Sequence, residues 1–76
     1  MMTQGEQLAS SLKRAPATYM EMLRWGISGC PWKRLAEYLD LPENKRVWQL
    51  EKGRRWVAGH EYLTTWRIVR KPRGVG

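Results

Sequence analysis

Residues 31–53 read PWKRLAEYLDLPENKRVWQLEKG, and the spacing of their apolar side chains is typical of two short helices joined by a turn. Pro31 suits the first position of a helix, because its φ angle is already fixed and no N–H is needed there. The apolar residues that follow recur at i, i+3, i+4 and i+7 and share one face: Trp32, Leu35, Ala36 and Leu39. The first helix is therefore predicted to run from Pro31 to about Leu39. Its opposite side carries Lys33, Arg34, Glu37 and Tyr38.

A second helix is predicted from about Asn44 to Lys52, after the turn Leu41-Pro42-Glu43-Asn44 and before Gly53. Val47 and Leu50 would then point toward the core. The opposite face would carry polar and basic side chains, with two more at its flanks: Lys45, Gln49 and Lys52, flanked by Arg46 and Trp48.

After Gly53 the chain becomes rich in aromatic and β-branched residues, first at 54–57 and again at 63–69, with AGHE at 58–61 between them. This pattern predicts a β-hairpin with Trp66 and Ile68 on its inner face and Thr65 and Arg67 pointing outward. Residues 71–76, KPRGVG, are predicted to form a disordered basic tail.

The segment before Pro31 predicts one further helix. Thr18-Tyr19-Met20-Glu21 matches a capping box, in which the Thr hydroxyl and the Glu carboxylate bind free amides at a helix start. The helix would continue to Ile27, where Gly26 and Gly29 supply a stop. Residues 1–17 are weakly patterned, and we interpret them as a flexible N-terminal arm in which Leu8 and Leu12 can form one helical turn.

These elements together predict an α+β fold in a single domain, residues 18–70: a winged helix-turn-helix, with three short helices followed by a two-stranded β-hairpin wing. A helix over residues 44–52 would be narrow enough to enter the major groove of DNA and would offer Lys45, Gln49 and Lys52 to base edges and phosphates. The hairpin would place three further cations against the adjacent backbone or minor groove: Arg54, Arg55 and Arg67.

The charge of the chain supports a polyanionic partner. The 76 residues carry 14 Lys and Arg against 7 Asp and Glu, a formal net charge of +7. Residues 1–44 hold five bases and five acids, whereas residues 45–76 hold nine bases and only Glu51 and Glu61 as acids. All of the excess charge is thus in the C-terminal 32 residues, which favours a binding surface for nucleic acid.

Several other classes are excluded by composition. Cys30 is the only cysteine and His60 the only histidine, so neither a disulfide framework nor a Cys/His zinc site is expected. No set of catalytic residues emerges, so we expect no enzymatic activity and no cofactor. No run of about 18 apolar residues occurs, and the first twenty residues lack a signal pattern. We therefore expect a cytoplasmic protein that does not enter membranes.

Three segments resemble the excisionase group of small winged-helix proteins, which is related to the MerR-type DNA-binding head. Leu35–Leu41 (LAEYLDL) is similar to the first helix and turn of that family, Val47–Arg54 (VWQLEKGR) to its recognition helix and exit, and Trp56–Tyr62 (WVAGHEY) to its wing. The similarity spans about half of the chain. It implies a protein that binds repeated double-stranded DNA sites, bends them and directs a phage or mobile-element integrase toward excision, with self-association on tandem sites.

Carried over to this chain, the resemblance makes four residues groove readers and three residues wing contacts: Lys45, Arg46, Gln49 and Lys52, and then Arg54, Arg55 and Arg67. Two other functions stay open. One is a small transcriptional repressor, and the other is a basic protein-interaction module or inhibitor that binds an acidic protein. Trp32 and Trp66 are predicted to be core, while Trp48 and Trp56 border basic faces and could equally stack on bases.

Overall fold

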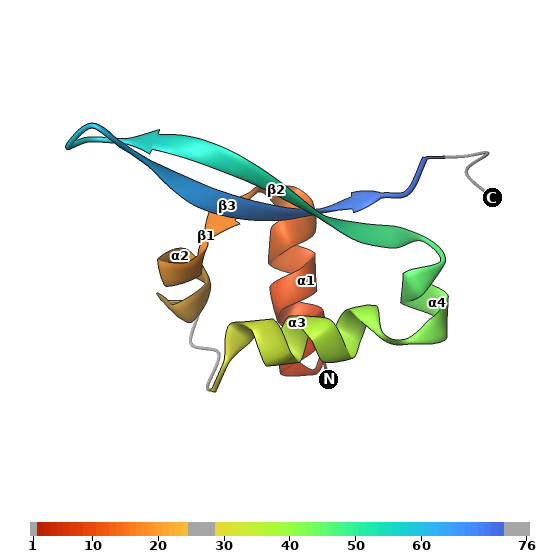
Figure 1. The fold of residues 1–76 in the computed structure, drawn as a ribbon. Helices are drawn as coiled ribbons and strands as arrows, with labels where there is room; N and C mark the ends of the chain where they lie inside the picture. Colours follow the sequence, from red (N-terminus) through yellow and green to blue (C-terminus); the bar gives the residue numbers. More distant parts are fainter. Residues whose placement is uncertain (1, 25–28, 73–76) are drawn as a thin grey trace.

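The computed structural model of the chain describes residues 2–24 and 29–72, which form an α+β fold as predicted. Its helices are α1 (Gln4–Arg14), α2 (Tyr19–Arg24), α3 (Pro31–Leu39) and α4 (Pro42–Lys45), and its strands are β1 (Ala17–Thr18), β2 (Trp48–Val57) and β3 (Glu61–Arg70). The strands form one antiparallel sheet in the order β1-β3-β2, so the sheet has three strands where the sequence predicted two. Helix α1 lies between this sheet and α3 (Figure 1).

The predicted hairpin is present and longer than expected. β2 and β3 pair over ten residues each, from Trp48 opposite Arg70 to Val57 opposite Glu61. A three-residue turn joins them, and its last two residues, Gly59 and His60, have positive φ angles of 110° and 67°. The third strand is short, since β1 pairs only with Trp66 and Thr65 of β3.

The predicted helix from Asn44 to Lys52 is wrong. Helix α4 ends at Lys45, and β2 begins at Trp48. The i, i+3 spacing of Val47 and Leu50 fits a helix. Residues 48–52 also fit a strand, in which successive side chains point alternately inward and outward. Periodicity alone cannot distinguish a helix from a strand over so short a run. Pairing with β3 supplies the strand with a full ladder of hydrogen bonds, and tertiary pairing of this kind overrides local helix propensity.

The N-terminal segment also differs from the expected loose arm. Residues 4–14 form α1, whose N-cap Thr3 accepts a hydrogen bond at 3.1 Å from the backbone N–H of Glu6. Leu8, Ala9 and Leu12 are completely buried. The local sequence carries only a weak helical pattern because most helical stability in proteins comes from packing an apolar face against the rest of the fold.

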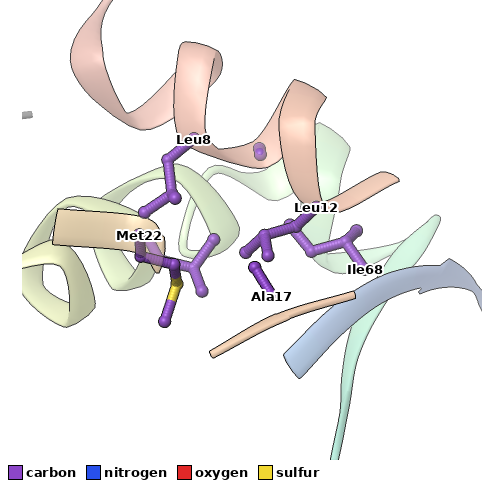
Figure 2. Packing of buried hydrophobic residues seen from close by; sticks show 7 residues of the cluster. Leu8, Leu12, Ala17, Met22 and Ile68 are labelled. Carbon is purple, nitrogen blue, oxygen red and sulfur yellow. The ribbon is translucent and has the colours of Figure 1, made fainter. Parts of the chain in front are cut away.

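The hydrophobic core combines residues from α1, β1, α2, α3 and β3 (Figure 2): Leu8, Ala9, Leu12, Ala17, Met22, Leu35 and Ile68. Trp32 and Trp66 pack against this cluster as predicted, with their rings edge-to-face and centroids 4.5 Å apart. Ala36, expected on the apolar face of α3, is exposed instead. Thr65 points to the side of the sheet away from α1, yet only 4 % of it is exposed.

The local signals around α2 and α3 are confirmed. Glu21 Oε1 accepts hydrogen bonds from the N–H and the hydroxyl of Thr18, while the Glu21 N–H donates to Thr18 Oγ1, as a capping box requires. Pro31 is the first residue of α3. The predicted end of the earlier helix at Gly26 and Ile27 lies outside the described residues, as do residues 73–76 of the predicted tail.

The start of that tail is tied to the fold. The Lys71 N–H donates to the carbonyl of Val47 at 2.8 Å, and Lys71 Nζ donates to the carbonyl of Lys45. In the part of the chain that the structure describes, the longest helix is α1 with 11 residues, and none of the helices is long and apolar enough to cross a bilayer.

Candidate nucleic-acid interface

The excess positive charge lies on the β2–β3 hairpin and at its base. Between residues 45 and 72 the structure describes eight basic side chains and two acidic ones. The basic residues are Lys45, Arg46, Lys52, Arg54, Arg55, Arg67, Arg70 and Lys71; the acidic ones are Glu51 and Glu61. All eight basic residues are exposed, so the hairpin offers a cationic surface to solvent.

The strand register separates the predicted site residues onto two faces. Directly opposite residues of an antiparallel pair point to the same side. On the inner face, which carries Ile68 and packs on α1, lie Lys52 and Arg54, opposite Trp66 and Thr64. On the outer face lie three other predicted contacts: Gln49, Arg55 and Arg67. A helix would have placed Gln49 and Lys52 on one side, but a strand places them on opposite sides.

Arg55 is engaged within the protein. Its Nη1 donates to Glu21 Oε1 at 2.5 Å and its Nη2 donates to the carbonyl of Pro16 at 2.9 Å. Because β3 lies between β2 and β1 in the sheet, the side chain has to cross the outer face to reach these partners. Arg55 therefore fixes the hairpin to the start of α2, and we call this contact the Arg55–Glu21 latch.

The capping box and, to a smaller extent, the latch lower the pKa of Glu21. Hydrogen bonding from the backbone N–H of Thr18 is the main influence that lowers the pKa of Glu21, and it outweighs the opposing effect of burial. The Thr18 hydroxyl and the Arg55 guanidinium lower the pKa further. The carboxylate at this position is thus held in its charged form, which keeps Arg55 in place.

The predicted residues at the base of the hairpin are split between an ion pair and open solvent. Lys45 Nζ lies 3.7 Å from Asp40 Oδ1, and both side chains are largely exposed. A pair of this kind is weak and exchanges readily for another anion. Arg46 follows in the turn before β2 and is exposed. Both cations therefore remain accessible to a polyanion beside the hairpin.

Trp48 has a structural role. It packs against the core, and two cations cover its ring: Lys13 Nζ at 4.2 Å and Arg70 Cζ at 5.5 Å from the ring centroid. Lys13 also donates to the Tyr38 hydroxyl at 2.7 Å. With its ring occupied in this way, Trp48 is not free to stack on a base, which resolves one of the alternatives that the sequence left open.

Lys52 and Arg67 are the predicted contacts with the least internal engagement. Both side chains are exposed, and neither side chain forms a hydrogen bond or an ion pair with any residue that the structure describes. Arg54 is exposed too, with its guanidinium carbon 5.4 Å from the centre of the Tyr62 ring. These three side chains can therefore bind phosphate without breaking a strong internal contact.

The outward side of α3 carries two basic residues and one acidic residue, and sequence reasoning did not assign it to the site. Leu35 is buried against α1, while Lys33 and Glu37 are exposed on the other side of the helix. Arg34 pairs with Glu37 at 3.4 Å, and both side chains are substantially exposed. The Lys33-Arg34 pair opposite the apolar stripe was the signal that could have found this face.

Comparisons with family models, with curated proteins and with solved structures gave no match to this chain. The resemblance to excisionases is also weakened at its central motif, because Val47–Arg54, which matched a recognition helix, consists of the last turn residue and most of strand β2. The candidate interface is therefore defined by the geometry of the hairpin and of α3.

Proposed function

We propose that the protein binds double-stranded DNA, with α3 in the major groove and the β2–β3 hairpin against the neighbouring backbone. The observation that carries this proposal is the accumulation of exposed cations on a hairpin that projects from the core (Figure 1). Phosphate contacts from Lys and Arg supply most of the affinity of such proteins. Lys52 and Arg54, on the inner face of the hairpin, are proposed to make such contacts with the duplex that α3 enters, and Arg67, on the outer face, is proposed to contact phosphates from the other side of the ribbon.

The arrangement of the elements supports the proposed geometry. The chain runs helix, strand, three helices and then hairpin, with the last strand between the other two, which is compatible with a small winged-helix domain. In helix-turn-helix proteins the second helix of the pair enters the major groove while the first crosses the backbone. Here the pair is α2 and α3, so the second helix is α3, and its exposed Lys33 and partly exposed Arg34 are suited to bases or phosphates. The groove-reading role thus moves from residues 44–52 to α3.

The test is a binding series with duplex DNA, single-stranded DNA and RNA at rising salt. With about five phosphate contacts, the slope of log affinity against log salt for duplex DNA should be roughly −4 to −5. Binding to an acidic protein with no duplex binding at about 0.1 M salt would contradict the proposal and favour the protein-interaction module instead.

A role in recombination rests on the excisionase resemblance alone, and repression of transcription is its alternative. Footprinting on the DNA that the protein selects separates them. Tandem sites at a recombination junction, occupied by self-associating copies next to an integrase, would indicate that the protein directs recombination. A single footprint that overlaps a promoter indicates repression.

A further inference from the structure

Two aromatic side chains are exposed near the turn of the hairpin. Trp56 and Tyr62 lie directly opposite each other on the inner face, and 51 % of Trp56 and 62 % of Tyr62 are exposed. Their rings meet edge-to-face with centroids 4.8 Å apart, and the His60 ring lies 5.6 Å from Trp56. We call this group, together with the neighbouring cation, the aromatic end: Arg54, Trp56, His60 and Tyr62.

The aromatic end lies away from the core. Because β1 pairs only with residues 65 and 66, the hairpin between residues 54 and 64 has two strands and no third strand beside it. Figure 1 shows this part of β2 and β3 extending beyond β1 and α2. None of its described residues is buried. The aromatic side chains are therefore not needed to fill the core.

Stabilisation of the hairpin explains only part of this arrangement. A cross-strand aromatic pair does strengthen a two-stranded hairpin. An edge-to-face contact, however, leaves much of the ring surface in water, and here about half of each side chain is exposed. The remaining apolar surface at the outermost part of a cationic hairpin indicates a contact with a partner.

The neighbouring charges define the chemistry of that partner. The Arg54 guanidinium lies beside the Tyr62 ring, and Lys52 lies on the same face two residues earlier. Glu61 is the one acidic residue among residues 54–64. A ligand that joins a flat aromatic ring to an anionic group meets both features, and a nucleobase with its phosphate is such a ligand.

We propose that the aromatic end is a stacking site for an unpaired base of DNA next to the duplex held by the rest of the interface. The inference rests on the proposed function and extends it to the form of DNA that is preferred. Bases within a continuous duplex stack on one another and offer no free face to Trp56, whereas an unpaired base beside the duplex does. Stacking of one base should raise affinity roughly five- to a hundredfold.

The test uses three DNA ligands with the same duplex: one blunt, one with a short unpaired overhang, and one with an overhang of equal length built from abasic sites. The two overhangs carry the same phosphates, so their difference isolates the bases. By fluorescence anisotropy at about 0.1 M salt, the wild-type protein should bind the overhang with bases roughly five- to a hundredfold more tightly than the abasic overhang.

The variant Trp56→Leu keeps an apolar side chain in β2 but removes the aromatic ring, and it should bring this affinity ratio close to one. Tyr62→Leu is a second variant and should lower the ratio as well. Tyr19→Leu changes an exposed aromatic residue of α2 outside the aromatic end and should leave the ratio unchanged. Circular dichroism checks that each variant is folded.

Equal wild-type affinity for the two overhangs overturns the stacking site, and so does an unchanged ratio in both folded hairpin variants. These results leave the proposed function intact as long as the blunt duplex is bound. Failure to bind any of the three ligands would contradict the stacking site and the proposed function together. Preference for bases over abasic sites without binding of the blunt duplex would support the stacking site and contradict the duplex-binding function.

Discussion

Gly5 lies where α1 crosses α3, and a larger residue there would collide with the backbone. A Cβ atom at this position would lie 2.7 Å from the carbonyl oxygen of Arg34 and 3.3 Å from Cβ of Tyr38. The carbonyl cannot move aside without displacing Leu35, which is buried in the core. We expect Gly5→Ala to lower the free energy of unfolding by about 1–3 kcal/mol, although alanine favours a helix by about 1 kcal/mol over glycine.

Urea unfolding measures this difference. Gln7→Ala is the matched control, because Gln7 is exposed in the same helix and the substitution should leave stability unchanged or slightly raised. If Gly5→Ala left stability unchanged or raised it, as expected for Gln7→Ala, then α1 and α3 would not approach each other as closely as described.

Glu21 connects the stability of the fold to pH. Its pKa is lowered in the folded protein, so its contribution to stability is present above the ordinary pKa of a carboxyl group and is lost as pH falls through the folded pKa. Glu21→Gln should be less stable than the wild type at pH 7, and the difference in free energy of unfolding should shrink on acidification to about pH 3.

Urea unfolding of both proteins at the two pH values checks this expectation. Glu43→Gln removes an exposed carboxylate of α4 for which the described residues offer no ion pair, and its difference from wild type should vary less between the two pH values. A Glu21→Gln difference that is constant with pH would show that the folded protein does not stabilise the charged carboxylate, through either Thr18 or Arg55.

Among the elements, those with strong local signals could be predicted from the sequence. The Thr18–Glu21 capping box and Pro31 act through neighbouring backbone groups, so their helices start where the sequence indicates. Helix α1 and the first half of β2 depend on distant partners instead. Residues 48–52 fit a helix or a strand, and only the register with β3, about twenty residues later, selects the strand.

The same limit applies to the candidate site. The distribution of charged residues along the sequence was sufficient to place the excess positive charge in the C-terminal part of the chain, and the exposed cations of the hairpin lie there. Which side chains point the same way depends on whether the period is 3.6 or 2. The wrong helix prediction at residues 48–52 therefore placed Gln49 and Lys52 on one face, whereas the strand puts them on opposite faces. The latch between Arg55 and Glu21 joins residues 34 positions apart, and no local pattern indicates it.

Arg55 and Arg67 lie on the same face of the hairpin but differ in their partners, so replacing each with alanine should affect DNA binding differently. Arg67 has no ion pair among the described residues, so Arg67→Ala should weaken duplex binding and reduce the magnitude of the salt slope by about 1. Arg55→Ala should weaken binding by releasing the hairpin, with little change in slope.

Titrations of both variants at several salt concentrations give the two slopes. Glu21→Gln provides the control, because loss of the latch from the carboxylate side should also weaken binding. If Glu21→Gln instead strengthened binding and Arg55→Ala reduced the slope, Arg55 would be a phosphate contact and not a positioning residue.

The choice of groove-reading element is tested by comparing α3 with β2. Lys33 is exposed on α3, whereas Gln49 lies on the outer face of β2. We expect Lys33→Ala to reduce the preference for the selected sequence over random duplex by about 1–3 kcal/mol, while Gln49→Ala leaves that preference unchanged. Competition binding with the two duplexes measures it. Loss of preference in Gln49→Ala alone would return the reading role to residues 44–52.

At the scale of the whole molecule, the core and the outer half of the hairpin are separate. The buried residues come from α1, β1, α2, α3 and the end of β3 near Ile68, and none lies between residues 54 and 64. Gly53 and Thr65 face each other in the register, so an Asn-Gly turn can replace residues 54–64 and close a shorter hairpin. This deletion removes Arg54, the latch and the aromatic end, but no core side chain.

We expect the shortened protein to fold, with a melting temperature reduced by a few degrees, because the latch and the outer strand pairs contribute little beside the core. Its affinity for duplex DNA should fall roughly tenfold or more, and its salt slope should become shallower by about 1, since Arg54 is lost while Lys52, Arg67 and α3 remain. Thermal melting and salt-dependent binding measure both effects. A folded protein with unchanged affinity would confine the interface to α3 and the base of the hairpin, and an unfolded one would show that the outer hairpin is required for the fold.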